Sequence, residues 1–152
     1  MTVEGMYHEE SVEIDASADE VYQLVSDIAR MGEWSPENVG GDWLDGATGA
    51  VGDRFEGHNK VGEREWSVPC QVTKADPGAE FQFVTGDAAD PVVRWSYRLA
   101  GSNPTTVTEV WDVERLPSTL VDASPERLAD RAAAVRAGMQ QTLAGIKASA
   151  EG

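Results

Sequence analysis

The carboxy-terminal stretch from Ser124 to Gly152 reads SPERLADRAAAVRAGMQQTLAGIKASAEG and decides the fold. Ser is a favoured helix cap and Pro suits the first helical position, so Ser124 and Pro125 predict a helix start. The residues of one face then recur at spacings of four, three, four, three and four. At about 100° per residue they form one narrow stripe, which predicts an amphipathic helix of roughly 25 residues. The stripe consists of Leu128, Ala132, Val135, Met139, Thr142 and Ile146, with Leu143 at its margin.

Alternating segments precede this helix. Tyr7 to Ile14 predicts a first strand, because Val12 and Ile14 share one face of an extended chain. Later strands are separated by short turn signals, which favours an antiparallel meander. Pro69 removes a backbone donor and therefore predicts a bulge or an edge. The later strands are expected at Asp53 to Lys60, Glu63 to Lys74, Glu80 to Thr85, Val92 to Ala100 and Thr106 to Leu116, with a short one around Asp42 to Leu44.

Two short helices are expected after the first strand. Ser17-Ala-Asp-Glu20 is a capping box, in which the Ser hydroxyl and the Glu carboxylate satisfy amides at a helix start. Apolar residues follow at i, i+3, i+4 and i+7, from Val21 to Ile28, which is a helical period. Met31 to Trp34 predicts a second helix, which the following Ser-Pro pair ends.

The alternation assigns one mainly apolar face and one mainly polar face to the sheet. We therefore expect the sheet to be covered on one side only. One helix is too narrow to cover six or seven strands, so the sheet must curl round it, with aromatic side chains filling or lining the remainder. The inward residues are Phe55, Gly57, Asn59, Trp66, Val68, Cys70, Val72, Phe81, Phe83, Val93, Trp95, Tyr97, Leu99, Val107, Glu109, Trp111 and Val113.

Charge and composition exclude several classes of function. The 152 residues include 27 acidic and 12 basic side chains, a formal net charge of −15. Such a chain lacks the basic surface that binds nucleic-acid phosphates, and anionic membranes repel it. No apolar run is long enough to cross a membrane and no signal peptide is visible, so we expect a cytoplasmic protein without stable membrane insertion, either a monomer or a homodimer. One cysteine and two histidines favour neither a disulfide nor a metal site.

The order of elements resembles the helix-grip fold, and several segments resemble the SRPBCC superfamily. This superfamily includes START-like lipid-transfer domains and polyketide cyclases. The resemblance implies a single α+β domain over residues 1–152, with a curved antiparallel sheet of six or seven strands round the long helix. It also implies a hydrophobic cavity and a lipid-like or aromatic polyketide-like ligand, and it implies neither a cofactor nor a universal catalytic motif. The resembling segments are Ala18 to Asp27, Met31 to Glu37, Val51 to Gly57, Val107 to Trp111 and Gly138 to Leu143.

The inward side chains give a set of candidate ligand-binding residues. Trp and Tyr would supply the few polar groups that such pockets use. The same aromatic side chains could instead form a plain core. The candidates are Trp34, Phe55, Trp66, Val68, Phe83, Trp95, Tyr97, Glu109, Trp111, Val135 and Met139.

Glu109 is the leading candidate for chemistry, because an inward carboxylate is costly unless it is paired or protonated. It could orient a ligand hydroxyl, or act as a general base with a raised pKa and Tyr97 as a hydroxyl partner. Alternatively it pairs with a buried Arg such as Arg131, or local twist turns it to solvent.

Three other residues have two interpretations each. Trp34 could be a lid over the ligand or a packing residue between the short helices and the sheet. His58 and Cys70 could form a catalytic pair, but their opposite parity argues against it. Cys70 is better interpreted as a small buried hydrophobe.

Three functions remain open from the sequence. The leading hypothesis is a carrier or sensor of a hydrophobic or amphipathic small molecule. The second is a cyclase/dehydrase-type enzyme with Glu109 as base. The third is an interaction protein whose interior is filled by side chains.

Overall fold

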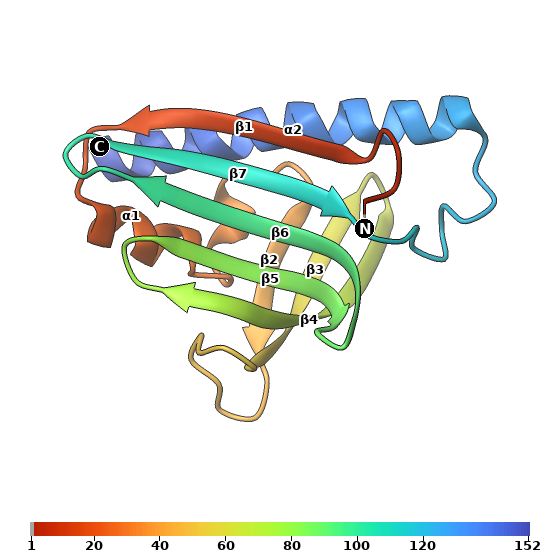
Figure 1. Cartoon of the computed structure of the whole chain (residues 1–152), viewed down its shortest axis with the longest axis horizontal. Coiled ribbons are helices and arrows are strands. Elements are labelled where there is room, and N and C mark those ends of the chain that lie inside the picture. Colours follow the sequence, from red (N-terminus) through yellow and green to blue (C-terminus); the bar gives the residue numbers. More distant parts are fainter. Residues whose placement is uncertain (1) are drawn as a thin grey trace.

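The computed structural model describes residues 2–152, in which seven antiparallel strands form one curled sheet beside a long helix (Figure 1). The strand order is β1-β7-β6-β5-β4-β3-β2, so β1 and β2 form the edges. The predicted helix-grip architecture is confirmed. The elements are β1 (Tyr7–Ile14), α1 (Ala18–Val25), η1 (Met31–Glu33), β2 (Asn38–Trp43), β3 (Arg54–Val61), β4 (Arg64–Asp76), β5 (Glu80–Asp87), β6 (Asp90–Ala100), β7 (Thr105–Val113) and α2 (Pro125–Glu151).

The long helix α2 begins where its cap predicts. The Ser124 hydroxyl accepts a hydrogen bond from the Arg127 amide at 3.2 Å, and Pro125 occupies the first turn. The predicted stripe is the buried face of the helix, except that Leu128 is only half-buried. Figure 1 shows α2 running alongside β1, at one edge of the sheet rather than across its middle. This placement leaves the far side of the concave face less covered.

The segment between β1 and β2 contains less helix than predicted. Ser17 caps α1 by accepting from the Glu20 amide at 3.2 Å. The helix ends at Val25, and Ile28 lies beyond it although its side chain is buried. The second helix is a single 3₁₀ turn, η1.

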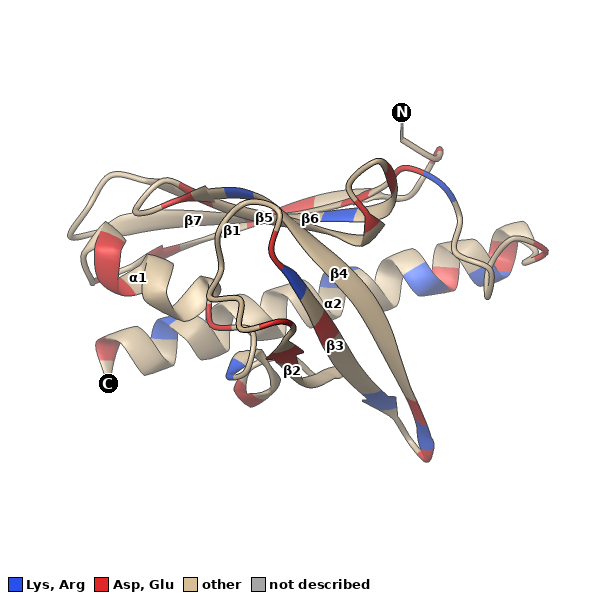
Figure 2. Cartoon of the chain, turned by 90° about the horizontal axis from the view of Figure 1, so that it is seen from below, with Lys and Arg blue, Asp and Glu red and all other residues tan. Residues whose placement is uncertain are grey.

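The sheet changes its pairing along β4. Pairing with β5 starts only at Cys70, so the first half of β4 pairs with β3 alone. Pro69 therefore lies where the other side of the strand is a free edge, as expected. The bulge lies further along, between Val72 and Lys74. The β3–β4 hairpin projects from the body of the molecule (Figure 2).

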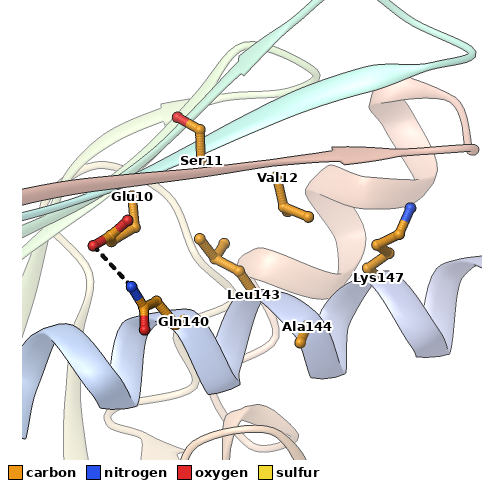
Figure 3. A pocket seen from close by; sticks show the side chains of 7 residues that line it. All are labelled: Glu10, Ser11, Val12, Gln140, Leu143, Ala144 and Lys147. Atoms are coloured by element: carbon orange, nitrogen blue, oxygen red, sulfur yellow. Dashed lines mark hydrogen bonds between the residues drawn. The ribbon is translucent and has the colours of Figure 1, made fainter.

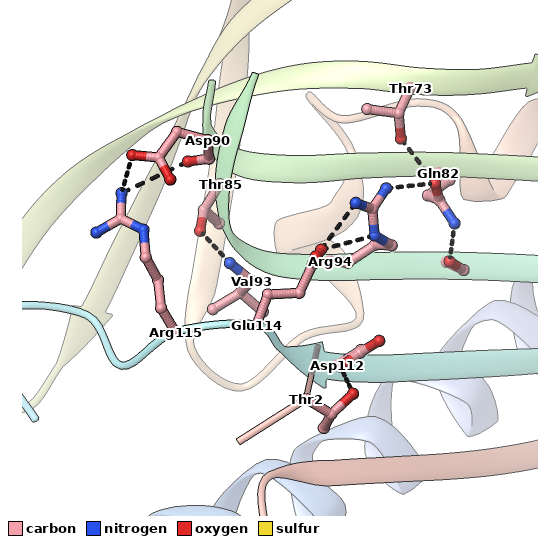
Figure 4. Close-up of polar contacts among 11 residues, drawn as sticks. Thr2, Thr73, Gln82, Thr85, Asp90, Val93, Arg94, Asp112, Glu114 and Arg115 are labelled. Carbon is pink, nitrogen blue, oxygen red and sulfur yellow. Dashed lines mark hydrogen bonds and ion pairs between the residues drawn. The ribbon is translucent and has the colours of Figure 1, made fainter. Parts of the chain in front are cut away.

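The outer face of the sheet is less exposed than predicted. Val84, Val110, Gln82 and Ser96 are buried, although their parity places them opposite the concave side. Polar side chains lying across this face provide the cover (Figure 4). Gln82 donates to Ser96 at 2.7 Å and accepts from Arg94 at 3.0 Å. These contacts join side chains of the strands themselves, and α1 and α2 pack on the opposite face, as expected.

Candidate functional site

Glu109 and Tyr97 form a buried polar pair on neighbouring strands. They are directly opposite each other in the β6–β7 register. The Tyr97 hydroxyl donates to Glu109 Oε2 at 3.1 Å. The two residues are only 3% and 4% exposed, and Glu109 Oε1 has no hydrogen-bond partner among residues 2–152. One carboxyl oxygen is thus satisfied, whereas the other is buried without a partner in this part of the chain.

Burial raises the pKa of the Glu109 carboxyl to about 8. The hydrogen bond from Tyr97 acts in the opposite direction, and the nearby carboxylate of Glu10 raises this pKa further. Burial also raises the pKa of Tyr97 well above its usual value. Near neutral pH, Glu109 is therefore mostly protonated, as a desolvated carboxyl without a cation should be.

The two non-functional interpretations of Glu109 do not hold. Arg131, the expected partner, binds both oxygens of Glu37 at 2.8 and 2.9 Å. Within residues 2–152, the one hydrogen bond to the Glu109 carboxyl comes from the Tyr97 hydroxyl. The burial of Glu109 also excludes an orientation towards solvent.

The predicted lining residues divide between two apolar clusters. Trp34, Phe55 and Tyr97 belong to a cluster that includes α1 and the end of α2, with Val68 and Phe83 at its margin. Trp111, Val135 and Met139 belong to a second cluster nearer the start of α2, with Trp95 at its margin. Trp66 belongs to neither, and the Arg64 guanidinium lies 4.8 Å from the centre of its ring. The candidate lining residues therefore do not all belong to one cluster.

Several inward side chains remain partly exposed. Phe83, Trp95, Trp66 and Val68 are half-buried, although they share the face that packs towards α2 elsewhere in the sheet. The placement of α2 explains this, because the helix packs mainly on β1 and only slightly on β7. The concave face of β4, β5 and β6 thus keeps accessible aromatic surface.

A hollow of about 210 Å³ lies between β1 and α2 (Figure 3). A second hollow of about 550 Å³ lies at the loop that connects β2 and β3. Neither includes a predicted lining residue. The first is lined by Glu10, Ser11, Val12, Gln140, Leu143, Ala144 and Lys147, and the second by residues of the segment 44–54.

Glu10 is the residue of this region that the sequence analysis missed. It lies opposite Glu109 in the β1–β7 register and binds Arg136 at 2.9 Å. Its parity matches that of Val12 and Ile14, so the signal was present in the alternation of β1. The signal is weak because glutamates occur on both faces of β1, so the position of Glu10 does not stand out from that of Glu9.

Trp34 is packed against the carboxy-terminal part of α2. Its indole is 5% exposed and donates to the Ser149 hydroxyl at 2.8 Å. Gly145 allows this approach, since a Cβ there would lie 2.9 Å from the Trp34 side chain. Together with the Glu37–Arg131 ion pair, this contact fastens the segment 34–37 to α2.

His58 and Cys70 lie on opposite faces of the sheet. Burial raises the pKa of the Cys70 thiol to about 12, so the thiol is not a ready nucleophile. His58 is bound to Asp42 and Ser67, each at 2.8 Å, on the outer face. Residues 2–152 contain no group of three or more His, Cys, Asp or Glu side chains placed to hold a metal ion.

The curled seven-stranded sheet and the long carboxy-terminal helix define a START-like helix-grip fold. Within this class the chain belongs to the family described as polyketide cyclase/dehydrase and lipid transport, which matches residues 8–151. In the part of the chain that the structure describes, no helix is both long enough and apolar enough to cross a membrane.

Solved structures support the same assignment. The Polyketide_cyc-like protein Cgl2372 from Corynebacterium glutamicum is 32% identical, with a TM-score of 0.66 over 93% of this chain and 88% of that chain. A START superfamily protein from Mycobacterium smegmatis is 16% identical, with a TM-score of 0.71 over 95% and 99%. The Zhui aromatase/cyclase from Streptomyces sp. R1128 is 15% identical, with a TM-score of 0.68 over 95% and 93%. The last two show the fold alone. No match was found among curated proteins.

Proposed function

We propose that this chain is a cytoplasmic protein that binds a hydrophobic or amphipathic small molecule, lipid-like or aromatic, on the concave face between the sheet and α2. The partial exposure of Phe83, Trp95 and Trp66 is the observation that supports this function most directly. A folded chain gains by removing such aromatic surface from water, by about 25 cal/mol for each Å². An apolar ligand on β4, β5 and β6 would supply that cover.

The buried pair gives such a ligand a polar contact at the boundary of the apolar surface. Tyr97 lies in one cluster, and Trp111, two residues from Glu109, lies in the other. Small-molecule sites typically combine a mostly apolar lining with a few placed polar groups, and this arrangement fits that description.

Binding of the neutral fluorescent probe N-phenyl-1-naphthylamine tests the proposal. Trp95→Ala should weaken binding of the probe by about tenfold, because it removes up to 1–2 kcal/mol of apolar contact. Tyr7→Ala is the matched control, since Tyr7 is 41% exposed and lies on the outer face. Absence of probe binding to the unmodified protein would contradict the proposal and favour the interaction protein with a filled interior.

A cyclase/dehydrase-type enzyme is the second candidate, favoured by the free oxygen of Glu109 beside the Tyr97 hydroxyl. A carboxyl with a pKa of about 8 exchanges protons readily near neutral pH. Its ionised fraction could take a proton from the carbon next to a ligand carbonyl, so that the electron pair passes to the carbonyl oxygen as an enolate, while the Tyr97 hydroxyl stays hydrogen-bonded to the Glu109 carboxyl.

Deuterium exchange into 1-tetralone in heavy water tests this activity. The unmodified protein should speed exchange at the carbon next to the carbonyl, and Glu109→Gln should remove the acceleration. An equal rate with both proteins would contradict the enzyme and leave the binding function in place.

A further inference from the structure

The carboxyl of Glu109 has one buried oxygen that lacks a hydrogen-bond partner among the described residues. Oε2 receives the Tyr97 hydroxyl at 3.1 Å, whereas Oε1 is buried without a partner among residues 2–152. Leaving a buried acceptor unpaired costs about 1–3 kcal/mol. A ligand that donates a proton to Oε1 would recover this free energy.

The basic side chains of α2 that reach the body of the molecule are already engaged. Arg131 binds Glu37 through two hydrogen bonds, and Arg136 binds Glu10 at 2.9 Å. Lys147 donates to the Glu13 carbonyl at 2.8 Å and also contacts Glu151. On the outer face, Arg94 binds Glu114 and Gln82. None of these cations contacts Glu109, so the site offers no basic partner to an anionic ligand head group.

Negative charge prevails around the site. Glu10 stands opposite Glu109 on β1 and turns into the gap between β1 and α2, where it also accepts from Gln140 (Figure 3). The whole chain carries a formal net charge of −15. Such a field attracts cations and repels carboxylates and phosphates.

From these contacts we infer that the ligand is a hydrophobic amine, whose ammonium group donates to Glu109 Oε1 while its apolar part covers the exposed aromatic face. This inference rests on the proposed binding function and names the chemical class of its ligand. Fatty acids and phosphate-bearing lipids are the classes that it excludes.

Binding of an amine requires one proton to leave the site. The pKa of the Glu109 carboxyl is raised to about 8, so the free protein is protonated there at pH 7. The ammonium keeps its own proton, and the carboxyl proton passes to the buffer as the ion pair forms. The other titratable groups near the pair are Tyr97 on β6, Glu10 and His8 on β1, and Arg136 on α2.

Three probes that differ only in their head group test the inference: n-decylamine, 1-decanol and decanoate. Calorimetry at pH 7 in two buffers of different ionisation enthalpy gives both affinity and proton release. The amine should bind about tenfold or more tightly than the alcohol, with decanoate weakest. Close to one proton should be released for each amine bound and none for the alcohol. Amine affinity should rise about tenfold per pH unit from pH 6 to pH 8 and then level off.

Variants separate the buried site from general surface attraction. Glu109→Gln should lose the preference for the amine and keep the affinity for decanol. Glu13→Gln makes the same substitution at an exposed position of β1 and should alter neither the preference for the amine nor the affinity for decanol. Because proton release is measured on the unmodified protein, it remains decisive even where Glu109→Gln folds poorly.

Three outcomes overturn the inference in different ways. Equal binding of amine and alcohol by the unmodified protein, without proton release, refutes the amine and leaves the binding function standing. Failure of all three probes to bind refutes both the amine ligand and the proposed binding function. An equal loss of amine affinity in Glu13→Gln would show surface attraction and also refute the amine.

Discussion

The two sides of the concave face differ in how the long helix meets them. On the side of β1, α2 is fastened by polar contacts: Lys147 donates to the Glu13 carbonyl, His8 bonds to the Ala132 carbonyl, and Glu151 accepts from the Asp15 amide. On the side of β4 and β5, inward aromatic side chains remain half-buried. The same alternation therefore produces a closed core on one side and accessible surface on the other. The position of the helix, rather than the strand pattern, makes the difference.

The largest expected effect is a difference in stability between these two sides. Ile146 is fully buried, and Ile146→Ala should lower the free energy of unfolding by about 2–5 kcal/mol. Trp66→Ala, on the half-exposed side, should lower it by less than about 1 kcal/mol. Urea unfolding followed by circular dichroism measures both. Comparable losses in the two variants would mean that both sides are equally packed.

The second prediction concerns pH at the boundary between the two sides. Glu109 has a pKa of about 8 in the folded chain, against about 4.3 when unfolded. The folded state therefore holds the proton more tightly. The tighter binding of this proton stabilises the folded state. The stabilisation is fully present below about pH 4, and it is lost progressively up to pH 8, at no more than about 1.4 kcal/mol per pH unit.

Glu109→Gln should remove this loss, because the amide does not ionise. The unfolding free energy of the variant minus that of the unmodified protein should increase between pH 5 and pH 8 and then remain level. Urea unfolding across this range measures the difference. Glu13→Gln is the control for the same substitution at an exposed position of β1. A difference that does not vary with pH would contradict the raised pKa.

Much of the fold followed from local signals in the sequence. Ser124 and Pro125 set the start of α2, and β1 has the predicted ends because its pattern is uninterrupted. The strand β2 is six residues long where three were expected, since paired glycines weaken a strand signal. The structure explains why glycine stands at position 41. A Cβ on Gly41 would lie 3.0 Å from the Ile28 side chain and 3.1 Å from the Glu56 carbonyl oxygen.

The candidate site followed from the sequence only in part. Parity placed Glu109 and Tyr97 on the inward face, but their pairing depends on the register of β6 and β7. Arg131 was one of the alternatives considered as a partner for Glu109, whereas it binds Glu37, which lies far away in the sequence. Helical spacing states which residues share a face and leaves open which strand that face meets. The partial exposure of Trp95 likewise depends on which strands α2 covers.

The smallest expected effect concerns the contact that fastens Trp34 to α2. Ser149→Ala removes the acceptor of the indole N–H at 2.8 Å and should lower the free energy of unfolding by about 1 kcal/mol. The loss is small because the apolar packing of the indole against Gly145 remains. Ser11→Ala is the matched control on the outer face of β1, where its hydroxyl bonds to Thr108 in an exposed position. If Trp34 were a mobile lid, Ser149→Ala would instead leave stability unchanged and alter the rate of probe entry. Urea unfolding and stopped-flow binding of N-phenyl-1-naphthylamine on these two variants distinguish a packing residue from a lid.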